Sequence, residues 1–196
     1  MYSKIIYFQK NSLFTYDINR HIILKLLNPF LIINTKNIYL FNIYINYIHN
    51  FNYTYSAKYN KSLLLLCCEA NFIEGVKQLI KKNVDINFIS LYPYTALIFA
   101  CRYEFRDIID ILLNHPNLKL DLQLITKFNQ GQFAIHICVI YSDSLLYPSP
   151  HMNKKKRCKI DIIKLIQKYD NNITIHPKTY KLARLKGITL LPLNCR

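Results

Sequence analysis

Residues 74–80 read EGVKQLI and residues 107–113 read DIIDILL, so two similar stretches lie 33 residues apart. Each opens with an acid, which suits a helix N-terminus because the helix dipole is positive there. Each places apolar residues at positions i, i+3 and i+4, which is the spacing of one helix face. The pattern predicts two amphipathic helices in repeated units, each of which needs a neighbour to cover its apolar face.

The period continues outside these stretches, since Leu64 matches Leu97 and Cys68 matches Cys101 at the same separation. A third unit follows, with Cys138 in its first segment and DIIKLIQ at residues 161–167 in its second. Its two segments are separated by 16 more residues than in the second unit, an insertion that contains two prolines and a basic run. We expect this insertion to form a projecting loop, because such a loop leaves the helices undisturbed.

The repeated residues resemble the ankyrin repeat. TALIFAC at residues 95–101 is similar to its first helix, FAIHIC at residues 133–138 keeps its histidine as His136, and NVDIN at residues 83–87 is similar to its Gly-Ala-Asp-Val-Asn turn. Asn83 then stands where glycine usually ends the helix in a left-handed conformation. The Thr-Pro pair is intact in no unit, and the glycine at the break between paired helices is missing from all three.

The resemblance implies an all-α fold, a short α-solenoid of stacked antiparallel helix pairs. We predict repeats over residues 59–171, divided as 59–90, 91–128 and 129–171, with the inserted loop at about 142–158. Residues 172–196 form a basic C-terminal cap or tail, in which residues 177–187 resemble one more first helix. Terminal repeats are usually atypical.

Residues 1–58 show no register with the repeats and are left unassigned. Ile22, Ile23, Leu26 and Leu27 form a short helical stripe before Pro29, so a degenerate capping unit is one interpretation. Residues 37–55 are rich in Tyr, Ile and Asn and lack glycine, and both helix and strand are open there.

Composition sets the broad class. The chain has 196 residues with 52% apolar and 19% charged residues, which suits one domain with an appendage and excludes a fully disordered chain. The net charge is +15, and residues 151–196 hold 12 Lys or Arg against two acids, whereas residues 61–150 hold eight of each. Such an excess favours anionic partners, whether nucleic acid, acidic protein or phospholipid.

Neither a membrane span nor an export leader is predicted. The longest apolar run, residues 21–34, is interrupted by Lys25 and Pro29 and is shorter than the ~20 residues that a span requires. The first apolar stretch is broken by charges before it reaches the length of a secretory h-region. We therefore expect a cytoplasmic protein, with a nuclear location as the alternative, whose six cysteines are reduced thiols.

The spacing of the cysteines, histidines and glycines does not indicate a catalytic or metal-binding site. Cys67, Cys68, Cys101 and Cys138 form no Cys-x-x-Cys pair and lie at the small positions of first helices, so we interpret them as core residues. His136 has no motif that supplies a nucleophile or an orienting carboxylate, and the resemblance implies a structural histidine that hydrogen-bonds the neighbouring turn. Three widely separated glycines exclude a phosphate-binding loop. We predict no enzymatic activity, no cofactor and no metal.

The leading functional interpretation is a non-enzymatic protein–protein interaction module, a scaffold or adaptor with a partner of unknown identity. Ankyrin geometry places several aromatic residues and one arginine at turns and at the ends of first helices. Tyr and Arg are enriched among interface hot spots, with aromatic residues favoured at interface cores. For any single residue, the alternative is that its side chain folds back over a neighbouring repeat. The predicted protein-binding residues are Tyr92, Tyr94, Arg102, Tyr103, Phe128 and Tyr141.

The alternative function is binding of nucleic acid or an anionic surface through residues 151–196. The run Lys154-Lys155-Lys156-Arg157 has the form of a nuclear-import or anion-binding patch, although such runs also fill ordinary solvated loops. Lys178, Lys181, Arg184 and Lys186 follow at spacings of three, three and two, which places three of them near one helix face. A basic strip of this kind can contact phosphates.

Overall fold

The computed structural model describes residues 28–48, 61–90, 94–124, 128–141, 158–170, 172–188 and 190. Within these ranges the chain is helical and contains no strand, with one isolated bridge between Gln123 and Asn129. The prediction of an all-α fold is confirmed. The stripe over residues 22–27 and most of the inserted loop lie outside the described residues.

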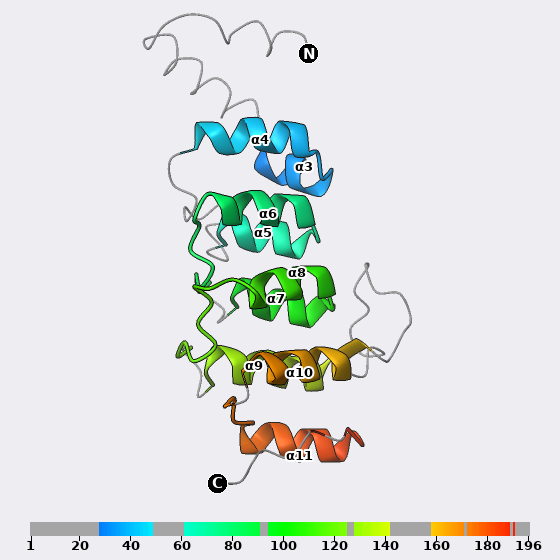
Figure 1. The fold of residues 1–196 in the computed structure, drawn as a ribbon. Helices are drawn as coiled ribbons and strands as arrows, with labels where there is room; N and C mark the ends of the chain where they lie inside the picture. The colour runs from blue at the N-terminus through cyan, green and yellow to red at the C-terminus, as the bar shows by residue number, and fades with distance from the viewer. Residues whose placement is uncertain are drawn as a thin grey trace, which may run out of the picture.

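The helices form stacked antiparallel pairs (Figure 1). First helices pack on first helices, from α3 through α5, α7 and α9 to α11, and second helices pack on second helices, from α4 through α6 and α8 to α10. The predicted α-solenoid is confirmed. In chain order the helices are α3 (Pro29–Asn34), α4 (Ile38–Tyr47), α5 (Leu63–Glu69), α6 (Ile73–Lys81), α7 (Ala96–Tyr103), α8 (Arg106–Leu113), α9 (Gln130–Ile140), α10 (Cys158–Tyr169) and α11 (Pro177–Leu185).

The pair α3–α4 forms a further layer on the N-terminal side of α5–α6, within the segment that the sequence left unassigned. The Asn28 side chain accepts a hydrogen bond from the Phe30 N–H at 2.9 Å, and Pro29 occupies the first turn of α3. Asn37 caps α4 in the same way through the Leu40 N–H at 3.0 Å. Of the two structures open for residues 37–55, the helix forms over Ile38–Tyr47.

The breaks between paired helices use left-handed residues other than glycine. Lys36, Asn71 and Glu104 have φ of 52°, 52° and 61° at the ends of α3, α5 and α7. The residue after each one donates its N–H back to a carbonyl five positions earlier; Phe72, for example, bonds the Cys67 carbonyl at 2.9 Å. This hydrogen bond closes the helix end and offsets the cost of the left-handed backbone. Asn83 also adopts the predicted left-handed conformation, with φ of 54°.

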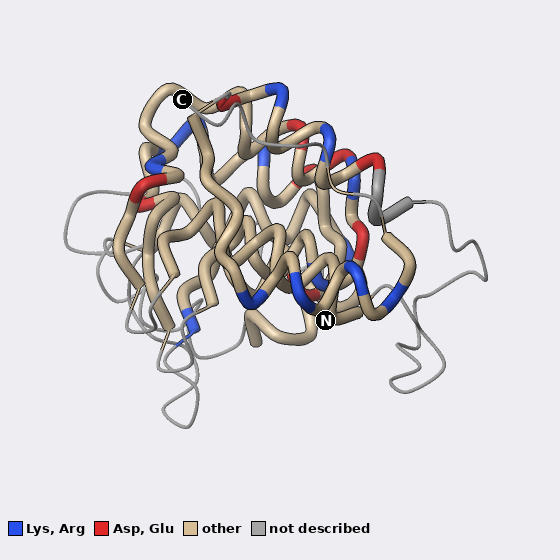
Figure 2. The backbone as a smooth tube through the Cα atoms, turned by 90° about the horizontal axis from the view of Figure 1, so that it is seen from below, with Lys and Arg blue, Asp and Glu red and all other residues tan. Residues whose placement is uncertain are grey.

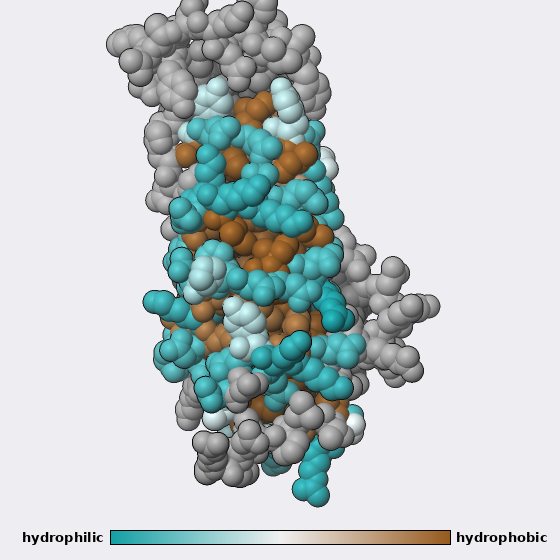
Figure 3. Space-filling model, in the orientation of Figure 1, coloured by the Kyte–Doolittle hydropathy of each residue, from teal (hydrophilic) through white to brown (hydrophobic). Residues whose placement is uncertain are grey.

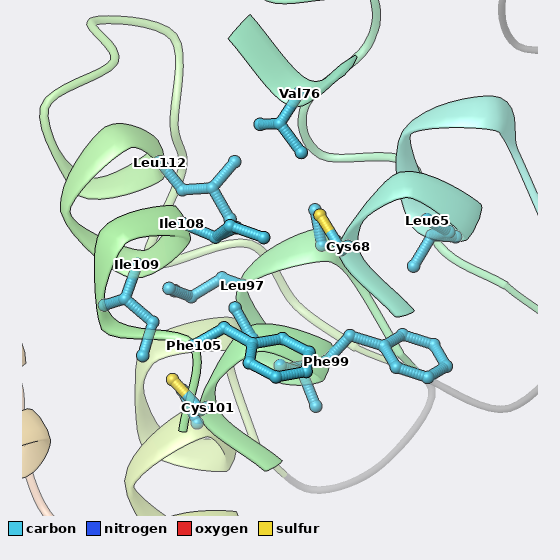
Figure 4. Packing of buried hydrophobic residues seen from close by; sticks show 14 of the residues in the cluster. Leu65, Cys68, Val76, Leu97, Phe99, Cys101, Phe105, Ile108, Ile109 and Leu112 are labelled. Carbon is cyan, nitrogen blue, oxygen red and sulfur yellow. The ribbon is translucent and has the colours of Figure 1, made fainter. Parts of the chain in front are cut away.

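The predicted apolar stripes form the core between layers (Figure 4). Val76 and Leu79 on α6, and Ile109 and Leu112 on α8, are fully buried. Lys and Arg residues lie with Asp and Glu around the periphery of the helices when the molecule is seen along the stack (Figure 2). In the face shown in Figure 3, hydrophilic residues cover α6 and α8 while apolar residues show between these layers. The charged helix faces therefore lie toward solvent, as the periodicity predicts.

Two phenylalanines outside the predicted stripes complete this core. Phe72 and Phe105 immediately precede α6 and α8 and are 1% and 8% exposed. The Phe72 ring packs edge-to-face with that of Phe41 from α4 at a centroid distance of 5.1 Å, so it joins two layers. Gly75 is required beside it, because a Cβ at this position would lie 2.7 Å from Cε1 of the Phe72 ring.

Candidate functional site

Arg102 lies in the last turn of α7 among three tyrosine rings. Its guanidinium carbon is 5.6 Å from the ring centroid of Tyr94, 5.5 Å from that of Tyr103 and 5.0 Å from that of Tyr141. Its Nη1 also donates a hydrogen bond to the Tyr94 hydroxyl oxygen at 3.1 Å. These four residues, called the Arg102 cluster below, are partly buried and come from two layers of the stack.

The helix ends explain why these residues meet. Tyr94 belongs to the turn that leads into α7, and Tyr141 is the C-cap residue of α9, which packs beside α7. The guanidinium lies over each of the three rings, and the electron-rich face of an aromatic ring attracts a cation. Partial burial raises the pKa of Tyr94 above its usual value, and the nearby Arg102 opposes this rise. The Tyr94 hydroxyl therefore stays protonated at neutral pH.

The Arg102 cluster borders a groove of about 320 Å³ between the α5–α6 and α7–α8 layers. On the far side of the groove, Lys61 pairs with Glu69 at 2.6 Å and lies 5.4 Å from the centroid of the Phe99 ring. The groove thus combines aromatic surface with charged groups from both layers. Its lining residues are Lys61, Glu69, Ser90, Tyr94, Phe99, Arg102 and Tyr103.

Phe128, also a predicted contact residue, is buried instead of lying in an exposed row with the tyrosines. Its ring centroid is 4.8 Å from that of His136 on α9 and 4.3 Å from that of His176, the N-cap residue of α11. This is the alternative in which an aromatic side chain folds back over a neighbouring repeat. Phe133 connects the two groups, since its ring lies 5.6 Å from Phe128 and 6.4 Å from Tyr94.

The remaining candidate residues divide between described and undescribed parts of the chain. Tyr92 and the run at residues 154–157 lie outside the described residues. Lys178, Lys181 and Arg184 are exposed on α11, which agrees with the predicted shared face. Lys186 instead donates a hydrogen bond to the Ile140 carbonyl at 2.7 Å, where a cation stabilises the negative end of α9.

His136 joins α9 to α11. Its Nδ1 lies 2.9 Å from Oγ1 of Thr179, a fully buried residue in the first turn of α11. Burial lowers the pKa of His136, and the nearby His176 and Lys178 lower it further. The contact with Thr179 therefore gives His136 a structural role, as the family resemblance implied, because it links α9 to α11 in the next layer.

We expect the stability of this junction to fall in acid. The pKa of His136 is lower in the folded chain than the value of about 6.5 in the unfolded chain. The unfolded state therefore binds more protons, so the stabilising contribution is present above about pH 6.5 and is lost as the pH falls through the lower, folded value. Urea titrations at neutral and mildly acidic pH measure this loss, and His136→Gln should reduce it. An unchanged pH dependence in the variant would contradict the role of His136.

The buried cysteines have no catalytic features. Burial raises the pKa values of Cys67, Cys68 and Cys101, and a hydrogen bond with Cys138 raises that of Cys101 further. These thiols stay protonated and act as small core residues, whereas the thiolate is the nucleophile and metal ligand. Within the described ranges, no three His, Cys, Asp or Glu side chains gather in a way that could hold a metal ion.

Four residues of the groove lining were absent from the predicted set: Lys61, Glu69, Ser90 and Phe99. Phe99 lies three and four positions before Arg102 and Tyr103, and this helical spacing could have placed it on the same face. Lys61 reaches Phe99 only because α5 stacks on α7, so no local sequence pattern indicates it. None of the helices in the described part of the chain has the length and apolar character of a membrane span.

Comparison with known proteins supports the repeat architecture. The family profile described as ankyrin repeats, three copies, matches residues 31–124 and 63–156, which is more than half of the chain. A fowlpox virus ankyrin repeat protein, FPV031, is 29% identical over 134 residues, covering 58% of this chain. The chain spans 38% of the length of that relative. The profile match begins within α3 and so includes the N-terminal helix pair.

Proposed function

Because the chain belongs to the ankyrin repeat family, whose repeats typically serve as protein-interaction modules, we propose that it is a non-enzymatic scaffold or adaptor that binds a protein through the surface around the Arg102 cluster. The observation that carries the proposal is the gathering of Tyr94, Arg102, Tyr103 and Tyr141 beside an aromatic groove. Rigid aromatic side chains and arginine are the residue types that dominate interface energetics.

The experiment compares capture of proteins from a nuclease-treated lysate by the full chain and by an Arg102→Ala/Tyr103→Ala variant. We expect the variant to capture at least about tenfold less of the partner, since a hot-spot residue contributes about 2 kcal/mol or more. Its thermal midpoint should change little, because both side chains are only partly buried.

Two controls accompany this comparison. Arg106→Ala removes an exposed arginine at the start of α8, outside the groove lining, and should retain full capture. Removal of residues 154–157 should also leave capture intact. If this deletion abolishes capture while the double variant binds normally, the interaction surface proposed here is wrong.

A second candidate function is binding of nucleic acid or an anionic surface through residues 151–196. It is favoured by the three exposed cations Lys178, Lys181 and Arg184 on α11, a helix without an acidic residue. Affinity for duplex DNA should then fall steeply between about 50 and 200 mM salt, because binding releases counterions. A protein interface anchored by the tyrosines should change much less over the same range.

A further inference from the structure

The guanidinium of Arg102 has donor capacity that the described side chains do not use. A guanidinium carries five N–H donors, and the one hydrogen bond that Arg102 makes here goes to the neutral hydroxyl of Tyr94. No carboxylate of the described residues forms an ion pair with Arg102. Glu69, the acid that lines the same groove, is paired with Lys61 at 2.6 Å. The positive charge of Arg102 therefore lacks a counter-charge among the described residues that line the groove.

The surroundings of Arg102 fix the guanidinium in place. Three tyrosine rings lie within 5.0–5.6 Å of its central carbon and displace water from part of its surface. The hydrogen bond to Tyr94 also restricts rotation of the side chain. A planar guanidinium held in this way is preorganised for a bidentate pair with a carboxylate, since little conformational entropy remains to be lost on binding.

The groove also limits the charge of its ligand. Among the described residues, its lining carries two cations and one acid, which sum to a charge of +1. That charge matches one carboxylate, whereas a phosphate group with a charge of about −1.5 to −2 would remain partly uncompensated.

Aromatic surface continues beside Arg102. Tyr94 and Tyr103 both line the groove next to Arg102 and are only half-buried, whereas Phe99 below them is 5% exposed. A peptide segment that lies across the groove would place apolar side chains against the exposed parts of the two tyrosine rings, with the acid between them. This geometry suits a carboxylate within a chain better than one at a chain end.

From these contacts we propose that Arg102 is the receptor for an Asp or Glu side chain in an extended segment of the protein partner, with apolar residues on either side of the acid. The proposal rests on the proposed function and adds the chemistry of the partner. Because the pair is charge-assisted, partly desolvated and bidentate, neutralising either member should weaken binding by about 10- to 100-fold.

The test uses the full chain as bait and selects the peptides that bind it from a displayed library of random sequences. We expect the selected peptides to share one acidic position flanked by apolar residues. A representative peptide is then measured with acid or amide at that position, against the unmodified chain and against Arg102→Gln. Each single change should weaken binding by about 10- to 100-fold. The two changes together should weaken binding little more than either change alone, because both remove the same ion pair.

Matched variants separate charge from geometry. Arg106→Gln makes the same substitution outside the groove lining and should leave affinity unchanged. Arg102→Lys keeps the charge but loses the planar fork, so its affinity should fall between those of the unmodified chain and Arg102→Gln. The comparison of acid and amide peptides uses the unmodified chain, so it stays decisive even if an Arg102 variant misfolds.

The outcomes distinguish this inference from the proposed function. Peptides that lack an acid but lose affinity with Tyr103→Ala would overturn the carboxylate receptor and leave the protein-binding surface in place. The same holds if phosphorylated peptides bind and carboxylate peptides do not. Selected peptides whose binding is indifferent to both Arg102 and Tyr103, or a library that yields no binder, would count against the binding surface itself.

Discussion

Replacement of Phe41 by alanine is expected to lower the free energy of unfolding by about 3–5 kcal/mol, the usual loss for a buried phenylalanine. The Phe41 side chain on α4 is fully buried, and its ring packs edge-to-face with that of Phe72 at a centroid distance of 5.1 Å. Removing it leaves a cavity between the α3–α4 and α5–α6 layers, which the surrounding helices can fill only in part. Urea denaturation followed by circular dichroism measures the change.

Tyr39 provides the matched control, since it is an aromatic residue on the same helix with 62% of its surface exposed. Tyr39→Ala should change stability by no more than about 0.5 kcal/mol, as at an ordinary surface site. If Phe41→Ala and Tyr39→Ala behave alike, residues 28–48 are not a layer of the stack.

Leu112→Ala is expected to cost about 2–5 kcal/mol of unfolding free energy. Leu112 is fully buried on α8, which packs against α6 on one side and α10 on the other. Its loss therefore weakens the middle of the stack. Lys81→Ala, at the exposed end of α6, should cost at most about 0.5 kcal/mol. Equal losses in the two variants on denaturant titration would show that the helix faces are assigned wrongly.

The sequence predicts the repeated helices well because their apolar faces recur at a fixed interval. Val76 and Ile109, like Leu79 and Leu112, lie 33 residues apart and are all fully buried. The same interval also relates Phe72 to Phe105 and Asn71 to Glu104, which occupy equivalent buried and left-handed positions. Comparison of these two pairs at the 33-residue interval would have predicted the breaks between paired helices, even though the usual glycines are missing.

The N-terminal helix pair was harder to predict. Its composition of Tyr, Ile and Asn suits a helix or a strand, and α4 offers no strong contrast between faces, because even its solvent side carries Tyr39. The local indications are the caps, Asn28 followed by Pro29 and Asn37 before α4. Such signals show where a helix begins but not whether a neighbouring layer will cover it.

In the candidate site, too, some residues can be predicted from the local sequence and others only from the stacking of the helices. Tyr94, Arg102 and Tyr103 follow from their places at the two ends of α7, and Tyr141 meets them because α9 stacks on that helix. The burial of Phe128 depends on His176 from α11, which is 48 residues away in the chain. Contacts of this kind require the stacked structure, and the repeat pattern alone does not specify them.

Buried cysteines give three successive layers of the stack a chemical reporter each. Cys68, Cys101 and Cys138 are fully buried in α5, α7 and α9, the first helices of successive layers. A thiol reagent can reach each of them only while its layer is open. In variants that keep one of the three cysteines and replace every other cysteine in the chain, labelling rates would time the opening of each layer. Equal rates would show that the layers open together, whereas a gradient would show that the solenoid frays from one end.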